Sequence, residues 1–187
     1  MVTIQINSTT GSELVSTSEL KDYARIETSA DDTLIGILIT SARTACEDYM
    51  NRDIVAKTRS YFRSNIPESS GDYFGLYKDR YKIVIPYAPI DTITSVQKQN
   101  SDGTFSDVGY ESYGLTDKYI LLSGNPNDDI KIAYSTSGLT DSAIKLAIMQ
   151  LATTYYDNRS DFVAGNISEL PTSVKKILDP FKFISDI

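Results

Sequence analysis

The chain has 187 residues, with 25 acidic and 18 basic side chains, and therefore a formal net charge of −7 at neutral pH. It contains no histidine and no tryptophan, and it has a single cysteine. These absences exclude a histidine general base, a Ser-His-Asp or Cys-His nucleophile pair, a histidine-rich zinc site and an intramolecular disulfide. The acidic balance disfavours tight binding to nucleic acid, because such binding normally needs a patch of lysine and arginine. We therefore expect a protein that is not an enzyme and needs no cofactor or metal.

Targeting and membrane signals are also missing from the sequence. The first residues lack the basic region and the long apolar run of a signal peptide. No run of about 18 apolar residues occurs, so we expect no membrane-spanning segment. With 41% hydrophobic and 23% charged residues, the composition is that of an ordinary globular protein.

Two helices are predicted near the start of the chain. Ser16 and Glu19 have the spacing of a capping box, and a short helix should follow to about Ala24. A second helix should run from the acidic pair at 31–32 to about Asn51, because apolar residues recur there at spacings of three and four. The residues of its apolar face are Leu34, Ile35, Leu38, Ala42, Ala45, Cys46 and Tyr49. A narrow polar stripe lies opposite and comprises Gly36, Thr40, Arg43, Thr44, Glu47 and Asn51.

The period then changes to that of β-strands. Residues 57–63 alternate in the manner of an edge strand or a half-exposed strand, and residues 83–85 form a short buried strand that Pro86 ends. A hairpin is predicted from residues 92–99 and 104–108, because the Asp-Gly pair at 102–103 is a strong turn signal. The strands at 118–122 and 129–134 should form another pair. Residues 53–138 are therefore interpreted as a small, mostly antiparallel β unit.

Helices return in the last quarter of the chain. Asp141 is a capping signal for a helix from Ser142 to about Asn158 that is apolar nearly all round. Such a helix must lie at the centre of its own core or also face a second chain, and its candidate core or ring-interface residues are Ile144, Ile148, Leu151 and Tyr155. A short last helix should follow Pro171 and end at the Asp-Pro pair 179–180.

The predicted fold is α+β, with a four-helix bundle and a central β insertion. The bundle comprises residues 14–52 and 139–181, and the insertion comprises residues 53–138. Residues 1–13 form an N-terminal extension, and residues 182–187 form a C-terminal tail.

Two groups of residues are candidates for partner contacts. Aromatic and basic side chains interleave between residues 61 and 87, and the candidates in a partner-binding hairpin are Tyr73, Phe74, Tyr77 and Tyr81. These tyrosines could stack on bases or grip a protein, and the alternative is that they simply cover the sheet. The apolar tail contains the candidate portal-docking residues Pro180, Phe181, Lys182, Phe183 and Ile184. A short apolar tail can order on a partner, and it can equally fold back on its own bundle.

Taken in order, these features resemble the phage head–tail connector (adaptor) family, which also occurs in gene transfer agents. Four stretches carry the resemblance: Leu14-Val15-Ser16 through Ala24-Arg25-Ile26; Asp31-Asp32 through Glu47 and Tyr49; Ile85-Pro86 through Ser95-Val96 and on to Asp102-Gly103; and Asp141 through Asn158-Arg159, then Leu170-Pro171 and Pro180-Phe181. The segment from Asn65 to Tyr81 looks longer than usual for the family, so no family contacts are transferred to it or to residues 1–13.

The resemblance implies a structural virion protein at the head–tail interface, assembled in the host cytoplasm. Members form a ring, usually dodecameric, beneath the portal, on which a stopper or tail assembles. The implied partners are further copies of the chain, the portal protein and a stopper or tail-completion protein. The genome would pass through the lumen without sequence-specific binding, and no catalytic residue is implied. The alternatives are another neck, tail-completion or baseplate component, or a nucleic-acid or glycan binding module that uses the tyrosine-rich hairpin.

Overall fold

The computed structural model describes residues 1–64, 80–124, 128–158 and 170–183. The chain forms two compact units, which are considered one at a time. The helical unit comprises Ser12–Ile54 and Leu139–Lys182. The β unit comprises Met1–Gly11, Val55–Gly138 and Phe183–Ile187. Within the described residues there are four α-helices and two antiparallel sheets, which confirms the predicted α+β class.

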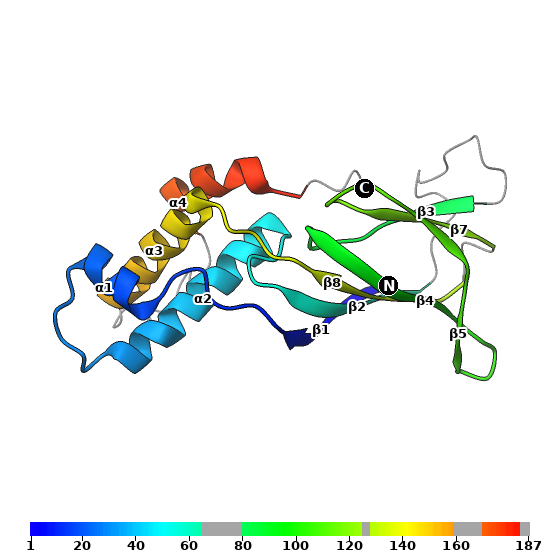
Figure 1. Ribbon diagram of the computed structural model, residues 1–187, viewed down its shortest axis with the longest axis horizontal. Helices are drawn as coiled ribbons and strands as arrows, with labels where there is room; N and C mark the ends of the chain where they lie inside the picture. Colours follow the sequence, from blue (N-terminus) through cyan, green and yellow to red (C-terminus); the bar gives the residue numbers. More distant parts are fainter. Residues whose placement is uncertain (65–79, 125–127, 159–169, 184–187) are drawn as a thin grey trace. The chain divides into compact units, whose positions relative to one another are not determined.

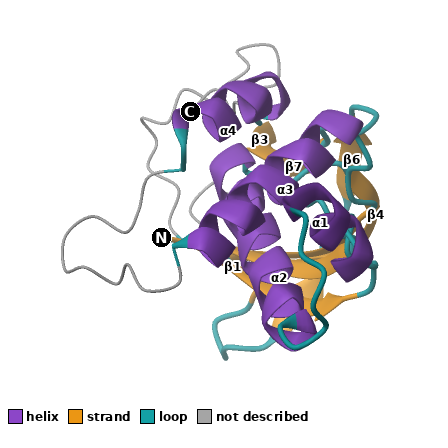
Figure 2. Cartoon of the chain, turned by 90° about the vertical axis from the view of Figure 1, so that its left-hand side faces the viewer, coloured by secondary structure: helices purple, strands orange, loops and turns teal. Residues whose placement is uncertain are grey.

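The helical unit is a bundle seen end-on in Figure 2. Its elements are α1 (Thr17–Ala24), α2 (Asp32–Met50), α3 (Ser142–Asp157) and α4 (Thr172–Leu178), with a 3₁₀ turn at Asp179–Phe181. The helices α2 and α3 pack against each other, α1 contacts both, and α4 packs mainly on α3. All four helices agree with the sequence prediction to within a residue or two.

The start of α1 is the capping box that the sequence predicts. The Glu19 backbone N–H donates to Ser16 Oγ at 3.3 Å, and the Ser16 backbone N–H donates to Glu19 Oε2 at 2.9 Å. The carboxylate of Glu19 also accepts a bond from Lys145 Nζ of α3 at 2.5 Å. One side chain therefore caps α1 and ties it to α3.

The core of the helical unit is apolar and continuous. All four helices contribute fully buried side chains to it, and α4 does so through Val174 and Leu178. The buried residues are Val15, Leu20, Ile35, Ile39, Ala42, Cys46, Met50, Ile54, Ile144, Ala147, Ile148, Leu151, Ala152, Val174 and Leu178.

The β unit contains two antiparallel sheets (Figure 1). Its strands are β1 (Val2–Thr9), β2 (Lys57–Arg63), β3 (Arg80–Val84), β4 (Ile90–Gln99), β5 (Phe105–Asp107), β6 (Tyr110–Tyr113), β7 (Tyr119–Ser123) and β8 (Ile130–Thr136). The larger sheet has the order β1-β2-β8-β4-β5, and the smaller has the order β3-β7-β6. Inward-facing residues of both sheets, such as Ile83, Ile120, Val96 and Ile132, belong to one buried apolar cluster.

One predicted strand pair is confirmed and the other is wrong. Strands β4 and β5 form the hairpin at Asp102-Gly103, where Gly103 adopts a φ of +84° that suits glycine. Strands β7 and β8 were expected to pair with each other, but β7 pairs with β3 and β6, while β8 pairs with β2 and β4. The pairing of β7 with β3 brings inward-facing apolar residues of remote segments together, as in the pair Ile83 and Ile120.

The strand at 57–63 is not an edge strand, contrary to the prediction. It lies between β1 and β8, and both Lys57 and Arg59 are about 4% exposed. The covering strand β1 comes from the residues that were interpreted as an extension outside the β unit. Alternation of Val2, Ile4 and Ile6 with polar residues is the signal that could have identified this strand.

Candidate interaction surfaces

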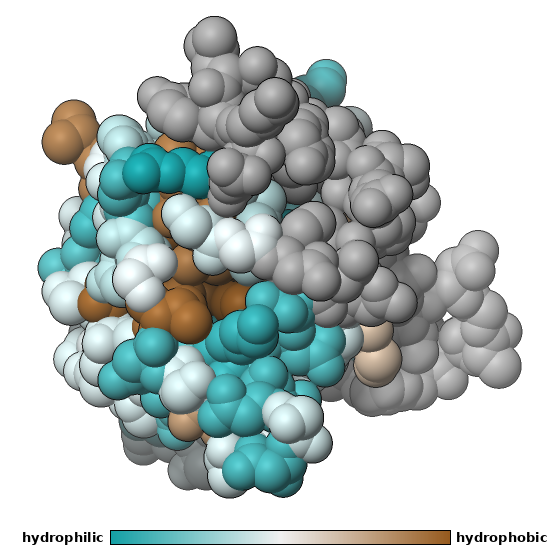
Figure 3. Space-filling view, turned by 90° about the vertical axis from the view of Figure 1, so that its right-hand side faces the viewer, coloured by the Kyte–Doolittle hydropathy of each residue, from teal (hydrophilic) through white to brown (hydrophobic). Residues whose placement is uncertain are grey.

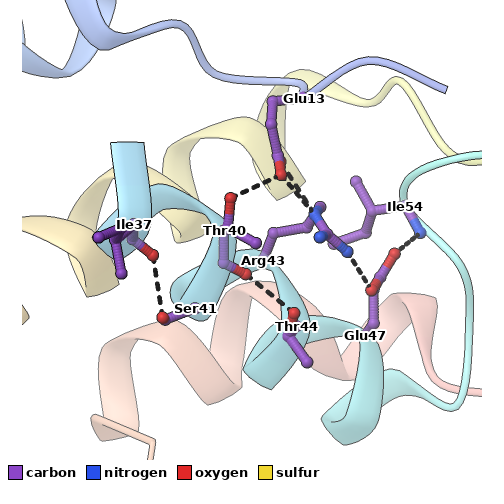
Figure 4. A network of polar contacts seen from close by, with 8 residues as sticks. All are labelled: Glu13, Ile37, Thr40, Ser41, Arg43, Thr44, Glu47 and Ile54. Carbon is purple, nitrogen blue, oxygen red and sulfur yellow. Dashed lines mark hydrogen bonds and ion pairs between the residues drawn. The ribbon is translucent and has the colours of Figure 1, made fainter. Parts of the chain in front are cut away.

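A buried polar network ties the C-terminal half of α2 to the chain segments beside it (Figure 4). Arg43 Nη1 donates to Glu47 Oε2 at 2.5 Å, and Arg43 Nε donates to Glu13 Oε2 at 2.9 Å. Glu13 also accepts a bond from Thr40 Oγ1 at 3.0 Å, and Glu47 Oε1 accepts the backbone N–H of Ile54 at 2.9 Å. The Arg43 side chain is 8% exposed and that of Glu47 is 2% exposed.

This network corrects the interpretation of the polar stripe on α2. Arg43 and Glu47 were assigned to a polar face opposite the apolar one, yet both are buried. They can be buried because each charge finds an oppositely charged partner and further hydrogen bonds. The segment before α1 and the segment after α2 are thereby fixed to the helix.

Three of the four candidate core or ring-interface residues of α3 lie in the core of the helical unit. Ile144, Ile148 and Leu151 are at most 1% exposed within the single chain. The core alternative holds for them, because α1, α2 and α4 all pack on α3. Tyr155 is partly buried, and burial raises the pKa of its hydroxyl. Leu146, on the opposite side of the helix, is 37% exposed.

The described part of the C-terminal segment lies against its own chain. Phe181 packs against the core of the helical unit, and Phe183 packs against the core of the β unit. Lys182 Nζ lies 4.0 Å from the ring centroid of Tyr49, whose hydroxyl donates to Asp179 at 2.7 Å. Pro180 and Lys182 are exposed. Ile184 lies outside the described residues, so portal docking by this segment stays a prediction.

Of the four tyrosine-hairpin candidates, only Tyr81 falls within the described residues, and Tyr73, Phe74 and Tyr77 lie outside them. Tyr81 is 6% exposed in β3 and faces the core of the β unit. Burial, together with the nearby Asp128 charge, raises its pKa to about 12. Tyr81 therefore covers the inside of the sheet and is not free to bind a partner.

A different aromatic group lies on the outer side of the smaller sheet. The rings of Tyr113 and Tyr119 stack with centroids 5.3 Å apart, and Lys82 Nζ lies 4.7 Å from the Tyr119 centroid. Arg80 pairs with Glu111 at 2.7 Å on the same side. Exposed apolar side chains elsewhere in the β unit include Phe105, Tyr110 and Leu115. Figure 3 shows apolar groups gathered near the middle of one face, with hydrophilic groups around them.

Features of a metal or membrane site are missing from the described part of the chain. No three histidine, cysteine, aspartate or glutamate side chains come together there as metal ligands would. Nor does any described helix have the length and apolar character to cross a bilayer. Cys46 is buried in the helical core, and burial raises the pKa of its thiol to about 12, so it is protonated and unreactive at neutral pH.

A comparison with protein families decides the affiliation of the chain. The family model described as head completion protein (HCP) matches residues 13–184. The chain belongs to the head completion protein family. The resemblance drawn from the sequence is thereby confirmed, since the matched range includes all four stretches that carry it. No curated protein matches the chain.

Solved structures share the fold of this head completion family member along almost its whole length. A chain in the neck of an empty gene transfer agent (GTA) particle, computed with C6 symmetry, is 14% identical with a TM-score of 0.68, covering 99% of this chain and 97% of that one. A chain in the virion of a native GTA particle is 15% identical with a TM-score of 0.70, covering 98% and 97%. A chain in a native GTA neck computed with C12 symmetry is 14% identical with a TM-score of 0.57, covering 96% and 97%.

Proposed function

We propose that this protein is a structural component of the neck of a phage or GTA-like particle. In this proposal, copies of the chain close into a ring that joins the portal to a stopper or tail, and the genome passes through the lumen. The observation that carries it is the family match over residues 13–184, together with a fold shared with GTA neck chains from end to end.

Ring contacts in this proposal come from exposed side chains and not from the core of α3. A ring needs two different surfaces on each subunit that meet head-to-tail. In the helical unit, Ile37 of α2 is 59% exposed and Leu146 of α3 is 37% exposed. The two residues lie on different helices. We assign these two positions to different sides of the ring contact.

The distribution of charge supports a conduit for DNA. The helical unit carries nine basic and fourteen acidic side chains, a net −5, and the β unit carries nine basic and eleven acidic ones, a net −2. Neither unit therefore presents the basic excess that would hold a polyphosphate by counterion release. A DNA molecule can slide past such a surface without being retained.

The test is an assembly assay with particles that lack this protein. Heads produced without it should fill with DNA but carry no tails, and addition of the purified protein should restore tail attachment. Ile37→Asp should abolish this restoration while leaving the circular-dichroism spectrum unchanged. Normal tail attachment in the absence of the protein would contradict the neck role. Restoration by Ile37→Asp at the wild-type level would remove α2 from the ring contact.

A further inference from the structure

The strand β1 forms an edge of the larger sheet that lacks the usual protection. Within the described residues it pairs with β2 alone, so no described strand lies along its other side. Natural edge strands are commonly short, charged or interrupted by proline, since a bare edge invites another strand. The eight residues of β1, Val2–Thr9, contain no charged side chain and no proline. The opposite edge strand, β5, has three residues and carries Asp107.

The backbone groups that point to the open side can be identified from the pairing with β2. The Met1 N–H donates to Ser64 O at 2.7 Å, and the Ser64 N–H donates to Met1 O at 2.9 Å. Hydrogen-bonded and non-hydrogen-bonded pairs alternate along an antiparallel ladder. Residues 1, 3 and 5 therefore direct their backbone groups to β2. The N–H and C=O groups of Val2, Ile4 and Ile6 point to the open side.

The side chains of the same three residues form an incomplete apolar row. Val2, Ile4 and Ile6 lie on the face of the sheet that covers the core, opposite Arg63, Tyr61 and Arg59 of β2. Ile4 packs against the core of the β unit, but Val2 is 53% exposed and Ile6 is 50% exposed. A further strand beside β1 would cover both of these side chains.

We propose that the open edge of β1 pairs with β1 of a second copy, antiparallel, about a two-fold axis at Ile4. In this register Val2 lies opposite Ile6 of the second copy, and Ile4 lies opposite its own equivalent. All three residue pairs are hydrogen-bonded pairs, so about six N–H···O bonds form and the two larger sheets become continuous. On the other face Thr3 lies opposite Gln5, and no like charges meet. The sequence of β1 is therefore self-complementary in both hydrogen bonding and side chains.

This pairing goes beyond the proposed ring and is independent of it. A two-fold contact is complete with two copies, whereas a ring requires head-to-tail contacts. The dimer is accordingly the form of the protein before assembly, in which the two β1 edges pair with each other. A failure of the β1 pairing and a failure of the neck role can be distinguished. The pairing is measured with the purified protein, and the neck role is measured with particles.

The test is sedimentation velocity of the full chain over a range of concentrations, with two matched variants. In Thr3→Lys/Gln5→Lys each lysine would face a lysine of the second copy, whereas in Thr3→Lys/Gln5→Glu each lysine would face a glutamate. Both wild-type residues are exposed, so neither variant disturbs the core. The wild type and the Lys/Glu variant should dimerise, and the Lys/Lys variant should have a dissociation constant at least about tenfold higher.

Amide hydrogen exchange gives a second readout for the register. The N–H groups of Val2, Ile4 and Ile6 should become protected as the concentration rises, while those of Ser106 and Asp107 on the other edge should not change. A wild type that stays monomeric at the concentrations tested, or that forms only rings, would overturn the proposal. Equal dimerisation of the Lys/Lys and Lys/Glu variants would overturn it as well.

Discussion

The helical unit and the β unit differ in how they bury their apolar side chains. In the helical unit, an almost wholly apolar helix, α3, is enclosed by three other helices of the same chain, and even the charged pair Arg43–Glu47 is buried with its partners. The β unit also has an apolar core, but its strand β1 has no described partner on one side. Its side chains Tyr113 and Leu115 are 41% and 92% exposed.

The comparison teaches that an apolar sequence is a poor guide to which surfaces of the folded chain stay exposed. The inner face of the apolar helix α3 is used within its own fold, because α1, α2 and α4 leave Ile144, Ile148 and Leu151 at most 1% exposed. Surfaces that remain for partners are less conspicuous in the sequence: an uncharged edge strand, single exposed residues such as Ile37, and stacked tyrosines on a sheet.

Ile148→Asp should have the largest effect on stability, because it places a carboxylate in the apolar core of the helical unit. An unpaired carboxylate at a position that is 1% exposed costs several kcal/mol, so this variant should unfold the unit or exclude it from the soluble fraction. Leu146→Asp on the same helix is the control and should change the free energy of unfolding by less than about 1 kcal/mol. Denaturant unfolding measures both. Equal stabilities of the two variants would mean that α3 is not enclosed as described.

Arg43→Met should lower the free energy of unfolding by about 3 kcal/mol, because it removes the Arg43 cation from the buried Glu47 carboxylate. The double variant Arg43→Met/Glu47→Gln keeps an acceptor for the Ile54 N–H and removes the charge. It should regain a large part of the loss. Chemical denaturation of the wild type, the single variant and the double variant makes this comparison. An unchanged free energy of unfolding in Arg43→Met would show that the network of Figure 4 does not stabilise the unit.

Glu19→Gln should make the stability of the helical unit less dependent on pH. Bonds from Lys145 and Ser16 lower the pKa of Glu19 from 4.5 to about 2 in the folded protein. Its ionised form therefore stabilises the fold above about pH 4.5, and this contribution is lost as the pH falls through about 2. The midpoint of urea unfolding should be lower for Glu19→Gln than for the wild type at pH 7, and the difference should shrink at pH 3. A difference that stays constant with pH would contradict the assignment.

Lys182→Ala should have the smallest effect on stability, about 0.5 kcal/mol, because its contact with the Tyr49 ring is at the surface. Phe181→Ala should cost more, since Phe181 packs on the helical core. If the C-terminal segment docks on the portal, Lys182→Ala should still weaken the binding of the purified protein to portal rings. Unchanged binding in a pull-down would remove Lys182 from the docking surface.

The helices could be predicted from the sequence because their signals are local. The capping box of Ser16 and Glu19 and the spacing of apolar residues in α2 and α3 each depend on neighbours within four positions. The Asp102-Gly103 turn is local in the same way.

Strand pairing and burial of charge could not be predicted in this way, because they depend on partners far along the chain. Strand β2 is interior only because residues 2–9 lie beside it, and β7 finds β3 about forty residues away. Arg43 is buried because Glu13 reaches it from thirty residues upstream, a partner that the pattern of α2 alone does not reveal.

The most direct test of the neck role is a cryo-electron microscopy map of the assembled particle at its head–tail junction. We predict a closed ring of α+β subunits between the portal and the tail, into which each unit of this chain fits separately, with Ile37 at a contact between neighbouring copies. A junction map in which no density matches the helical unit or the β unit would contradict the account.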